Sequence, residues 1–157
     1  MDYTIREMQK QDYPLLEHFL YEAIFIPKGM EPPPRNIITS PELQVYIEHF
    51  GELKDDMGLV AETDGQIIGA VWARIMNDYG HIDNETPSLA ISLYKEYRNL
   101  GIGTALMKEI LTLLKSHGYK RVSLSVQKAN YAAKLYLKVG FETVAEKEDE
   151  YIMVNCL

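Results

Sequence analysis

The sequence predicts an α/β domain spanning residues 1–157, built on a mixed, mostly antiparallel sheet of about seven strands. Short apolar segments, each bounded by turn residues, predict strands along the whole chain. The dipeptide Asp64-Gly65 between two of these segments predicts a tight antiparallel hairpin. A helix of crossover length separates residues 88–93 from residues 121–126, so these two strands are expected to run parallel.

The N-terminal half is expected to combine helices and strands, because the spacing of its apolar residues changes along the chain. Asp12 is the expected N-cap of the first helix, with Pro14 just inside it. Residues 25–35 contain four prolines and a glycine, which predict an ordered loop after that helix. The expected elements are a strand at 3–6, a helix reaching Ile24, a helix from Pro41 to about Phe50, and strands at 57–62 and 66–75.

The C-terminal half is organised around residues 88–117, where an apolar strand leads through a polar turn into an amphipathic helix. The first amides of a helix lack intrahelical partners and lie at the positive end of the macrodipole, so this arrangement predicts an anion site. Gly101 and Gly103 would let a phosphate approach the backbone closely. The remaining expected elements are a strand at 121–126, a short helix from Asn130 to Gly140, and a hairpin of strands at 141–146 and 151–154.

The spacing of these glycines argues against two common phosphate loops. A P-loop has four residues between its glycines and then Gly-Lys-Ser/Thr, whereas only Ile102 separates Gly101 from Gly103. A dinucleotide fingerprint needs a third Gly or Ala where this chain has Leu106. The pattern that remains is Arg-x-x-Gly-x-Gly, with Arg98 on the entrance side of the turn.

This turn, directly after a predicted central strand, resembles the pyrophosphate loop of the GNAT superfamily of acyl-CoA-dependent N-acetyltransferases. A second segment, Asn130-Tyr131-Ala132-Ala133-Lys134-Leu135-Tyr136 followed by Gly140-Phe141, resembles the other signature of that family. The resemblance is close over residues 88–141 and extends to the rest of the chain in pattern only. It implies helices on both faces of the sheet and a splayed central strand pair that admits the pantetheine arm.

The resemblance also implies a function. The chain would be an N-acetyltransferase that moves an acetyl group from acetyl-CoA directly to a primary amine of a small molecule or peptide, through a ternary complex. The alternative is a non-catalytic acyl-CoA-binding or regulatory domain that keeps the phosphate loop but has lost the base. Retention of Tyr136 favours the enzyme.

The resemblance assigns the acetyl-CoA contacts to one loop and its neighbours. In the family, amides of the central strand hold the pantetheine and the oxyanion, and a tyrosine of the second motif acts as general acid. A phenol suits that role because it stays protonated at neutral pH, although a tyrosine on an amphipathic helix can also simply face the core. The expected cofactor-binding residues are Ile91, Leu93, Arg98, Asn99, Leu100, Gly101, Ile102, Gly103, Thr104, Asn130 and Tyr136, and Tyr136 is the expected acid.

The base and the acceptor site are less sharply indicated. Family members often use a carboxylate near the start of the central strand, and Glu85 is the candidate here, with Asp83 and His81 nearby. The alternative for Glu85 is turn chemistry before Pro87. The candidates for the acceptor site are Phe25, Trp72, Tyr79 and Arg74, although a tryptophan on a hydrophobic strand is most often a core residue.

The charge of the chain argues against nucleic acid as its main partner. The formal net charge is −7, and it is unevenly distributed. Residues 1–80 carry 14 acidic and 6 basic side chains, whereas residues 81–157 carry 9 and 10. An anionic cofactor would fit the C-terminal half and a cationic amine the N-terminal half, unless the charge serves only solubility.

Length and composition set further limits. A chain of 157 residues with 46% hydrophobic residues suffices for one domain with a sizeable core. No apolar segment reaches membrane-spanning length and the N-terminus lacks the regions of a signal peptide, so a cytoplasmic protein is expected. The single cysteine, Cys156, excludes an intrachain disulfide and a thiolate-rich metal site, and no metal is expected. The sequence leaves a homodimer open.

Overall fold

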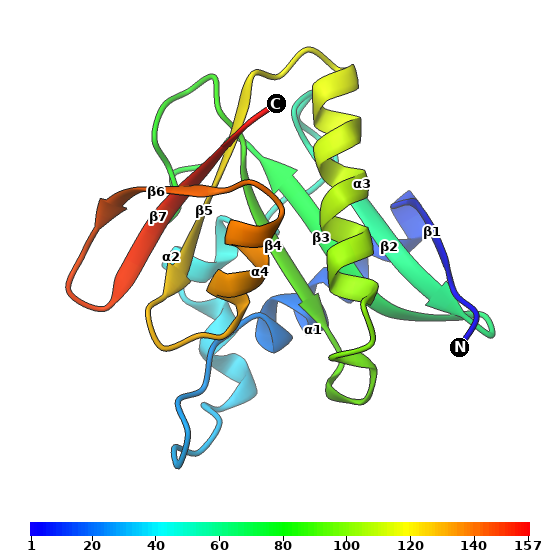
Figure 1. Cartoon of the computed structure of the whole chain (residues 1–157). Coiled ribbons are helices and arrows are strands. Elements are labelled where there is room, and N and C mark those ends of the chain that lie inside the picture. The colour runs from blue at the N-terminus through cyan, green and yellow to red at the C-terminus, as the bar shows by residue number, and fades with distance from the viewer.

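The strands form one seven-stranded sheet in the order β1-β2-β3-β4-β5-β7-β6, in a computed structural model that describes residues 1–157 (Figure 1). Neighbouring strands are antiparallel except β4 and β5, which are parallel. The predicted mixed sheet is thereby confirmed. The strands are β1 (Thr4–Glu7), β2 (Met57–Thr63), β3 (Gln66–Arg74), β4 (Ser88–Leu93), β5 (Arg121–Gln127), β6 (Glu142–Glu146) and β7 (Glu150–Cys156).

Helices cover both faces of the sheet, as expected. In Figure 1, α3 (Ile102–Ser116) and α4 (Ala132–Lys138) lie in front of the sheet, and α1 (Leu16–Glu22) and α2 (Pro41–Gln44) lie behind it. Short 3₁₀ helices precede three of the α-helices. They are η1 (Lys10–Leu15), η2 (Arg35–Thr39) and η3 (Lys95–Tyr97). None of the helices is long and apolar enough to cross a membrane.

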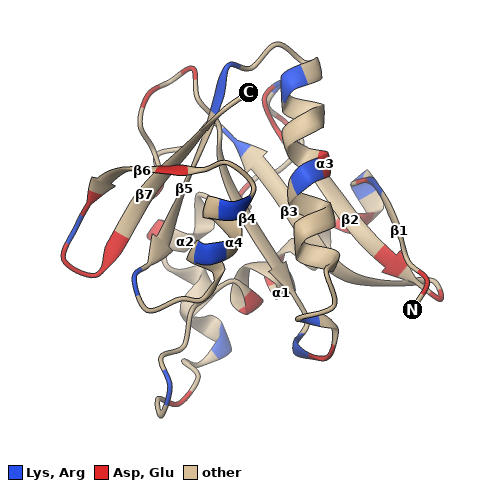
Figure 2. Cartoon of the chain, viewed as in Figure 1, with Lys and Arg blue, Asp and Glu red and all other residues tan.

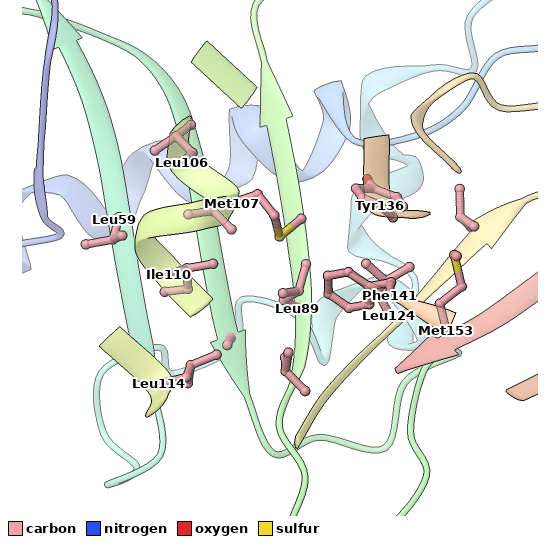
Figure 3. Close-up of a cluster of buried hydrophobic side chains, with 14 of the residues drawn as sticks. Leu59, Leu89, Leu106, Met107, Ile110, Leu114, Leu124, Tyr136, Phe141 and Met153 are labelled. Carbon is pink, nitrogen blue, oxygen red and sulfur yellow. The ribbon is translucent and has the colours of Figure 1, made fainter. Parts of the chain in front are cut away.

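The sheet separates two hydrophobic cores. Successive side chains of a strand point to opposite faces, so β3 supplies both cores at once. Val71 and Ala73 belong to the core under α3, and Ala70 and Trp72 belong to the core behind the sheet. Figure 3 shows the first core, where the apolar stripe of α3 meets the sheet. Its helical members Leu106, Met107, Ile110 and Leu114 are completely buried.

The first helix differs from its prediction at the N-terminal end. A 3₁₀ helix precedes α1, and Asp12 lies inside it instead of capping α1. The Asp12 carboxylate accepts hydrogen bonds from the Arg6 guanidinium at 2.7 Å and from the Gln9 amide at 2.8 Å. These hydrogen bonds tie the start of η1 to the edge strand β1. The prediction of Asp12 as a helix N-cap was therefore wrong.

The second helix is shorter than predicted. It ends at Gln44, and the chain then continues to Phe50 in turns. The carbonyls of Val45 and Glu48 accept hydrogen bonds from Arg74 at 3.2 and 2.8 Å. Because Arg74 binds these carbonyls, the turn is held by a long-range contact and not by a continuing α-helical ladder.

The parallel strands β4 and β5 pair over a very short distance. Their register contains one pair of partners, Ser88 and Ser123, and the Ser123 amide donates to the Pro87 carbonyl at 2.9 Å. Beyond that point the strands diverge, whereas β5 continues to pair with β7 over its whole length. The predicted splay of the central strands is present, and it creates a gap inside the sheet.

Candidate active site

The gap exposes backbone amides on the edge of β4. The Tyr94 amide donates to the Ile68 carbonyl of β3 at 3.1 Å, and the amides of an antiparallel strand alternate in direction. The amides of Ile91 and Leu93 therefore point away from β3 and into the gap. These are the amides for which pantetheine and oxyanion contacts were predicted.

The opposite edge of the gap belongs to β5. The Ser123 amide is already directed at β4, since it donates to the Pro87 carbonyl. By the same alternation, the amide of Ser125 faces the gap two residues further along. A flexible amide-containing chain laid between β4 and β5 could thus hydrogen-bond to both strands.

A run of free amides lies at the end of this gap, between η3 and α3. The Arg98 amide donates to the Lys95 carbonyl, and the first hydrogen bond of α3 runs from Ala105 to the Gly101 carbonyl at 3.1 Å. The amides of residues 99–104 in between donate to no group of the chain. A helix N-terminus with such free donors is a ready anion site.

The conformation of this loop keeps the approach to its amides open. Asn99 and Gly101 adopt positive φ angles of 63° and 86°. A Cβ built on Gly101 would meet nothing within 4 Å, and one built on Gly103 would make only ordinary contacts with Leu93 and Leu135, at 3.6 and 3.9 Å. The space in front of the loop is therefore free for a phosphate group.

The Arg98 side chain links this loop to the C-terminal end of α1. Its guanidinium donates to the Leu93 carbonyl at 2.9 Å and to the Glu22 carboxylate at 3.1 Å. Glu22 is the last residue of α1. In this arrangement the backbone of the loop, and not the Arg98 side chain, offers the free donors.

A cavity of about 410 Å³ opens beside the gap. Its walls come from α1 and the following loop, the turn after α2, β4, β5, α4 and the β6–β7 turn. Most of the lining side chains are apolar. Five residues predicted for the site line it together, namely Phe25, Tyr79, Ile91, Asn130 and Tyr136.

Tyr136 belongs both to this cavity and to the core. The residue is 8% exposed, and its ring packs against Phe141 with centroids 6.0 Å apart (Figure 3). Burial raises the pKa of the Tyr136 phenol to about 12. The side chain is therefore protonated at neutral pH and available as a proton donor. Nearby, Asn130 accepts the Ala132 amide at 2.9 Å and so fixes the start of α4.

Two of the predicted acceptor residues lie elsewhere. Trp72 is completely buried, and its indole N–H donates to the Tyr46 carbonyl at 2.9 Å. Arg74 is 4% exposed and forms an ion pair with Asp56. Both side chains hold the core and the turn after α2. Neither lines the cavity, so the structure does not bring them together with the other predicted acceptor residues.

The predicted base also lies outside the cavity. Glu85 is exposed, and its amide donates to the Asp83 carboxylate at 2.9 Å. Asp83 in turn pairs with Arg121 on the surface. This is the turn chemistry that the sequence left open as an alternative. Glu85 does not line the cavity that contains Tyr136, and its catalytic role stays a prediction.

Sequence reasoning missed a polar group beside the cavity. Tyr46 and Ser125 line the cavity, and burial, together with the negative charge of Asp78, raises the pKa of the Tyr46 phenol. Asp78 accepts a hydrogen bond from the Ser88 hydroxyl at 2.7 Å. Burial raises the pKa of Asp78. These residues come from separate segments, so no local motif could have indicated them.

Charged side chains lie at the rim. The acidic residues Asp149 and Glu150, at the turn between β6 and β7 and the start of β7, line the cavity. Figure 2 shows acidic residues on this hairpin and basic residues on α4. The chain contains no group of three or more His, Cys, Asp or Glu side chains placed to bind a metal ion. The site combines an anion loop at the end of a gap that has free amides with a neighbouring cavity, which a phenol and two acidic side chains line.

Comparison with known sequences places these features in a family. The sequence matches the model of the acetyltransferase (GNAT) family over residues 13–141. The N-alpha-acetyltransferase of Sulfurisphaera tokodaii is 32% identical over 124 residues, which cover 69% of this chain and 73% of the relative. The N-alpha-acetyltransferase of Saccharolobus solfataricus is 31% identical over 141 residues, which cover 78% of this chain and 83% of the relative.

Comparison with solved structures agrees. The PaiA N-acetyltransferase of Thermoplasma acidophilum, in complex with coenzyme A, superposes with a TM-score of 0.73 at 22% identity, with 100% of both chains covered. The putative acetyltransferase YncA of Salmonella typhimurium, with acetyl-CoA, gives a TM-score of 0.70 at 17% identity, covering 100% of this chain and 95% of YncA. At these identities the likeness establishes the fold.

Proposed function

The chain belongs to the GNAT family of acetyltransferases, whose co-substrate is acetyl-CoA, and we propose that it transfers the acetyl group directly to a primary amine. The observation that carries this proposal is the position of Tyr136. Its phenol lines the same cavity as Ile91, whose amide faces the gap between β4 and β5. A proton donor and backbone amides thus surround one reaction space.

The geometry supports a division of roles for acyl transfer. The free amides of residues 99–104 would bind the pyrophosphate, and the amides facing the gap would hold the pantetheine arm. The Leu93 amide would stabilise the negative charge that develops on the carbonyl oxygen. Tyr136 would protonate the departing thiolate. The amine attacks the thioester directly, so no covalent intermediate on the chain is required.

The lining of the cavity supports the α-amine of a peptide as the acceptor. Its outer wall is apolar and includes Leu20, Ile24 and Phe25, which suits the side chain of an apolar first residue. Asp149 and Glu150 at the rim suit the approach of one ammonium group. The names of the two relatives, both N-alpha-acetyltransferases, point to the same class of acceptor.

Release of free coenzyme A, measured with a thiol reagent, tests the proposal. Acetyl-CoA is incubated with peptides that begin with Met, Leu, Ser or Asp, and with polyamines, aminoglycosides and free amino acids. Turnover is expected with the peptides that begin with an apolar residue. Turnover only with small amines would overturn the peptide assignment. Acetyl-CoA binding without turnover on any acceptor would favour the non-catalytic acyl-CoA-binding domain.

A further inference from the structure

The side chain of Arg98 joins three parts of the site. Arg98 belongs to the glycine turn, yet the free donors of that turn are the backbone amides of residues 99–104. The Arg98 guanidinium is occupied by oxygens of the chain itself. It donates to the Leu93 carbonyl at 2.9 Å, and to the carboxylate and the carbonyl of Glu22 at 3.1 and 3.3 Å.

Each of the joined parts belongs to the site. Leu93 is the last residue of β4, and its amide faces the gap. Arg98 directly precedes the run of free amides that begins at Asn99. Glu22 is the last residue of α1, and the next three residues, 23–25, line the cavity and are here called the acceptor wall. The guanidinium therefore connects the cofactor side of the site to its acceptor side.

The end of α1 depends on this contact. The last carbonyls of a helix lack intrahelical partners, and an arginine can satisfy them and complement the negative end of the macrodipole. No backbone amide donates to the Glu22 carbonyl, and Arg98 is its donor. In the acceptor wall, the amides of Ala23 and Ile24 still bond back to carbonyls of α1, whereas the Phe25 amide donates to no group of the chain.

The middle of α1 is held to the sheet by other contacts. The Ser92 hydroxyl of β4 donates to the Phe19 carbonyl at 2.6 Å, and both residues are buried. The Phe19 ring also packs against Tyr94, with centroids 4.9 Å apart. Loss of the contact between Arg98 and Glu22 would therefore release the end of α1 and the acceptor wall, but leave the body of the helix in place.

We propose that Arg98 and Glu22 form a clamp that couples acetyl-CoA binding to the acceptor wall, with Glu22 as a positioning residue that acts through Arg98. This inference rests on the proposed acetyl transfer to an amine. A pyrophosphate on the amides of residues 99–104 restrains the loop, and with it the backbone of Arg98. The guanidinium then separates from Glu22 less often, so the end of α1 and the acceptor wall open less often.

The clamp has a consequence for the reaction. Direct acetyl transfer needs the amine and the thioester in one defined geometry, and a small displacement lowers the rate steeply. The loop would fix acetyl-CoA and the acceptor wall would contact the acceptor, so the clamp sets the position of one relative to the other. By thermodynamic linkage, each ligand strengthens the binding of the other by the same factor.

Hydrogen exchange with and without acetyl-CoA tests the clamp in the absence of an acceptor. In the parent, acetyl-CoA is expected to slow exchange in residues 99–104 and also at the amides of Ala23 and Ile24. In Glu22→Ala, exchange is expected to slow in the loop alone. Arg98→Lys is expected to behave in the same way, because an ammonium cannot present the fork of a guanidinium. This second variant carries the test if Glu22→Ala fails to fold.

Steady-state kinetics test the clamp with a peptide acceptor on which the parent turns over. Glu22→Ala is expected to lower kcat/KM for the acceptor by about fivefold, the upper range for a partly exposed ion pair. Glu22→Gln keeps an oxygen that accepts from the guanidinium, so it is expected to recover most of this loss. In an Arg98→Ala background, Glu22→Ala is expected to cause no further loss, because the contact is already absent.

Glu62 provides a matched control. Its ion pair with Arg6 is similarly exposed, with side chains 30% and 28% exposed against 19% and 39% for Glu22 and Arg98. The pair joins β2 to β1 at one edge of the sheet, and neither side chain lines the cavity. Glu62→Ala is expected to change neither the effect of acetyl-CoA on hydrogen exchange nor kcat/KM.

The outcomes separate the clamp from the function on which it rests. If acetyl-CoA does not slow exchange at Ala23 and Ile24 in the parent, or slows it equally in folded Glu22→Ala, the clamp is overturned alone. An equal effect of Glu22→Ala on kcat/KM with and without the Arg98 side chain also overturns it. A parent enzyme that binds acetyl-CoA but acetylates no amine overturns the proposed function, and the exchange experiment still decides on the clamp.

Discussion

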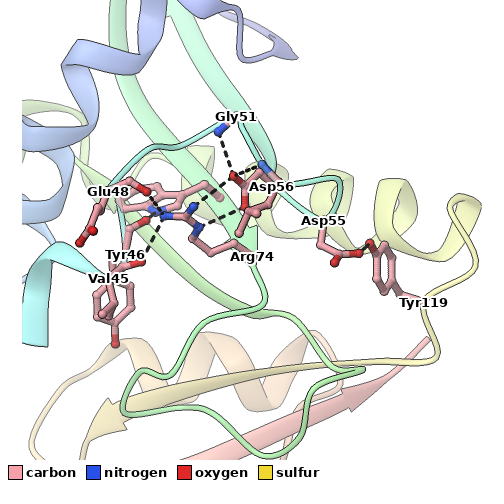
Figure 4. Close-up of polar contacts among 10 residues, drawn as sticks. Val45, Tyr46, Glu48, Gly51, Asp55, Asp56, Arg74 and Tyr119 are labelled. Atoms are coloured by element: carbon pink, nitrogen blue, oxygen red, sulfur yellow. Dashed lines mark hydrogen bonds and ion pairs between the residues drawn. The ribbon is translucent and has the colours of Figure 1, made fainter.

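Arg74 and Asp56 form a two-point ion pair inside the protein. The guanidinium Nε and Nη2 each lie 3.1 Å from one oxygen of the Asp56 carboxylate, as Figure 4 shows. The side chains are only 5% and 0% exposed. Asp56 also accepts the Gly51 amide at 2.9 Å, so the pair joins the end of β3 to the turn after α2.

Removing one partner of this pair is expected to destabilise the fold strongly. Asp56→Ala leaves the Arg74 charge buried without its counter-ion, which typically costs about 3–5 kcal/mol. Urea unfolding, followed by circular dichroism, measures the change. Lys147→Ala breaks a more exposed pair with Glu150 and is expected to cost less than about 1 kcal/mol. An equal decrease in the free energy of unfolding in both variants would show that the buried pair stabilises the fold no more than the exposed pair does.

Substitution in the anion loop is expected to weaken acetyl-CoA binding. In Gly103→Val the new Cβ fits beside Leu93 and Leu135 without a clash, and its two methyl groups are expected to narrow the space around the free amides. Loss of one hydrogen bond to a charged group costs about 1.5–3 kcal/mol, so Kd measured by calorimetry is expected to rise by at least tenfold. Thr112→Val, on the exposed side of α3, controls for valine in the helix. An unchanged Kd in folded Gly103→Val would contradict the assignment of the loop.

Removal of the Tyr136 hydroxyl is expected to slow the chemical step. Tyr136→Phe keeps the ring in the core but removes the proton donor, so kcat is expected to fall by about 100-fold. The Kd for acetyl-CoA is expected to stay the same, because a thioester sulfur is a poor acceptor in the ground state. Turnover equal to that of the parent would make Tyr136 a packing residue.

The raised pKa of Tyr136 leads to a prediction about the pH dependence of kcat. The raised pKa of about 12 keeps the phenol protonated across the range of ordinary assays. Loss of the proton from Tyr136 therefore causes no fall of kcat between about pH 7 and pH 10. A steady-state profile of kcat over that range is the measurement. A basic limb that disappears in Tyr136→Phe would contradict this environment for the phenol.

The acidic rim is expected to attract the acceptor. Asp149→Asn removes one charge from the cavity rim and is expected to raise the KM for a cationic acceptor by about two- to fivefold, the range of exposed charge pairs. The KM for acetyl-CoA is expected to change little. In the parent enzyme, KM for the acceptor is expected to rise with salt, because screening shortens the attraction. A flat salt response would leave the acidic residues a role in solubility only.

Features encoded by local sequence were predicted well. The strand at 88–93, the glycine turn and α3 follow one another in the chain, and each has its own propensity and capping signal. The Asp64-Gly65 hairpin is equally local. The residues of one contiguous loop could therefore be assigned to an anion site before their geometry was known.

Features that depend on distant contacts were not predictable in this way. The end of α2 is set by Arg74, which lies 29 positions after Val45. Asp78 accepts a hydrogen bond from Ser88, which lies ten positions later on β4. Trp72 has the same local pattern whether it faces a core or a ligand, and only the packing of α1 and α2 behind β3 decides between them.

The gap between β4 and β5 is expected to change the usual order of isotope exchange within the sheet. Amides at the centre of a sheet are commonly the last to exchange with deuterium. Here the amides of Ile91 and Leu93 lack a strand partner, whereas those of Ala90 and Ser92 are bonded to β3. Rapid and slow deuterium uptake therefore alternate along one central strand. Addition of acetyl-CoA is expected to remove the alternation, because the ligand then takes the place of the missing strand.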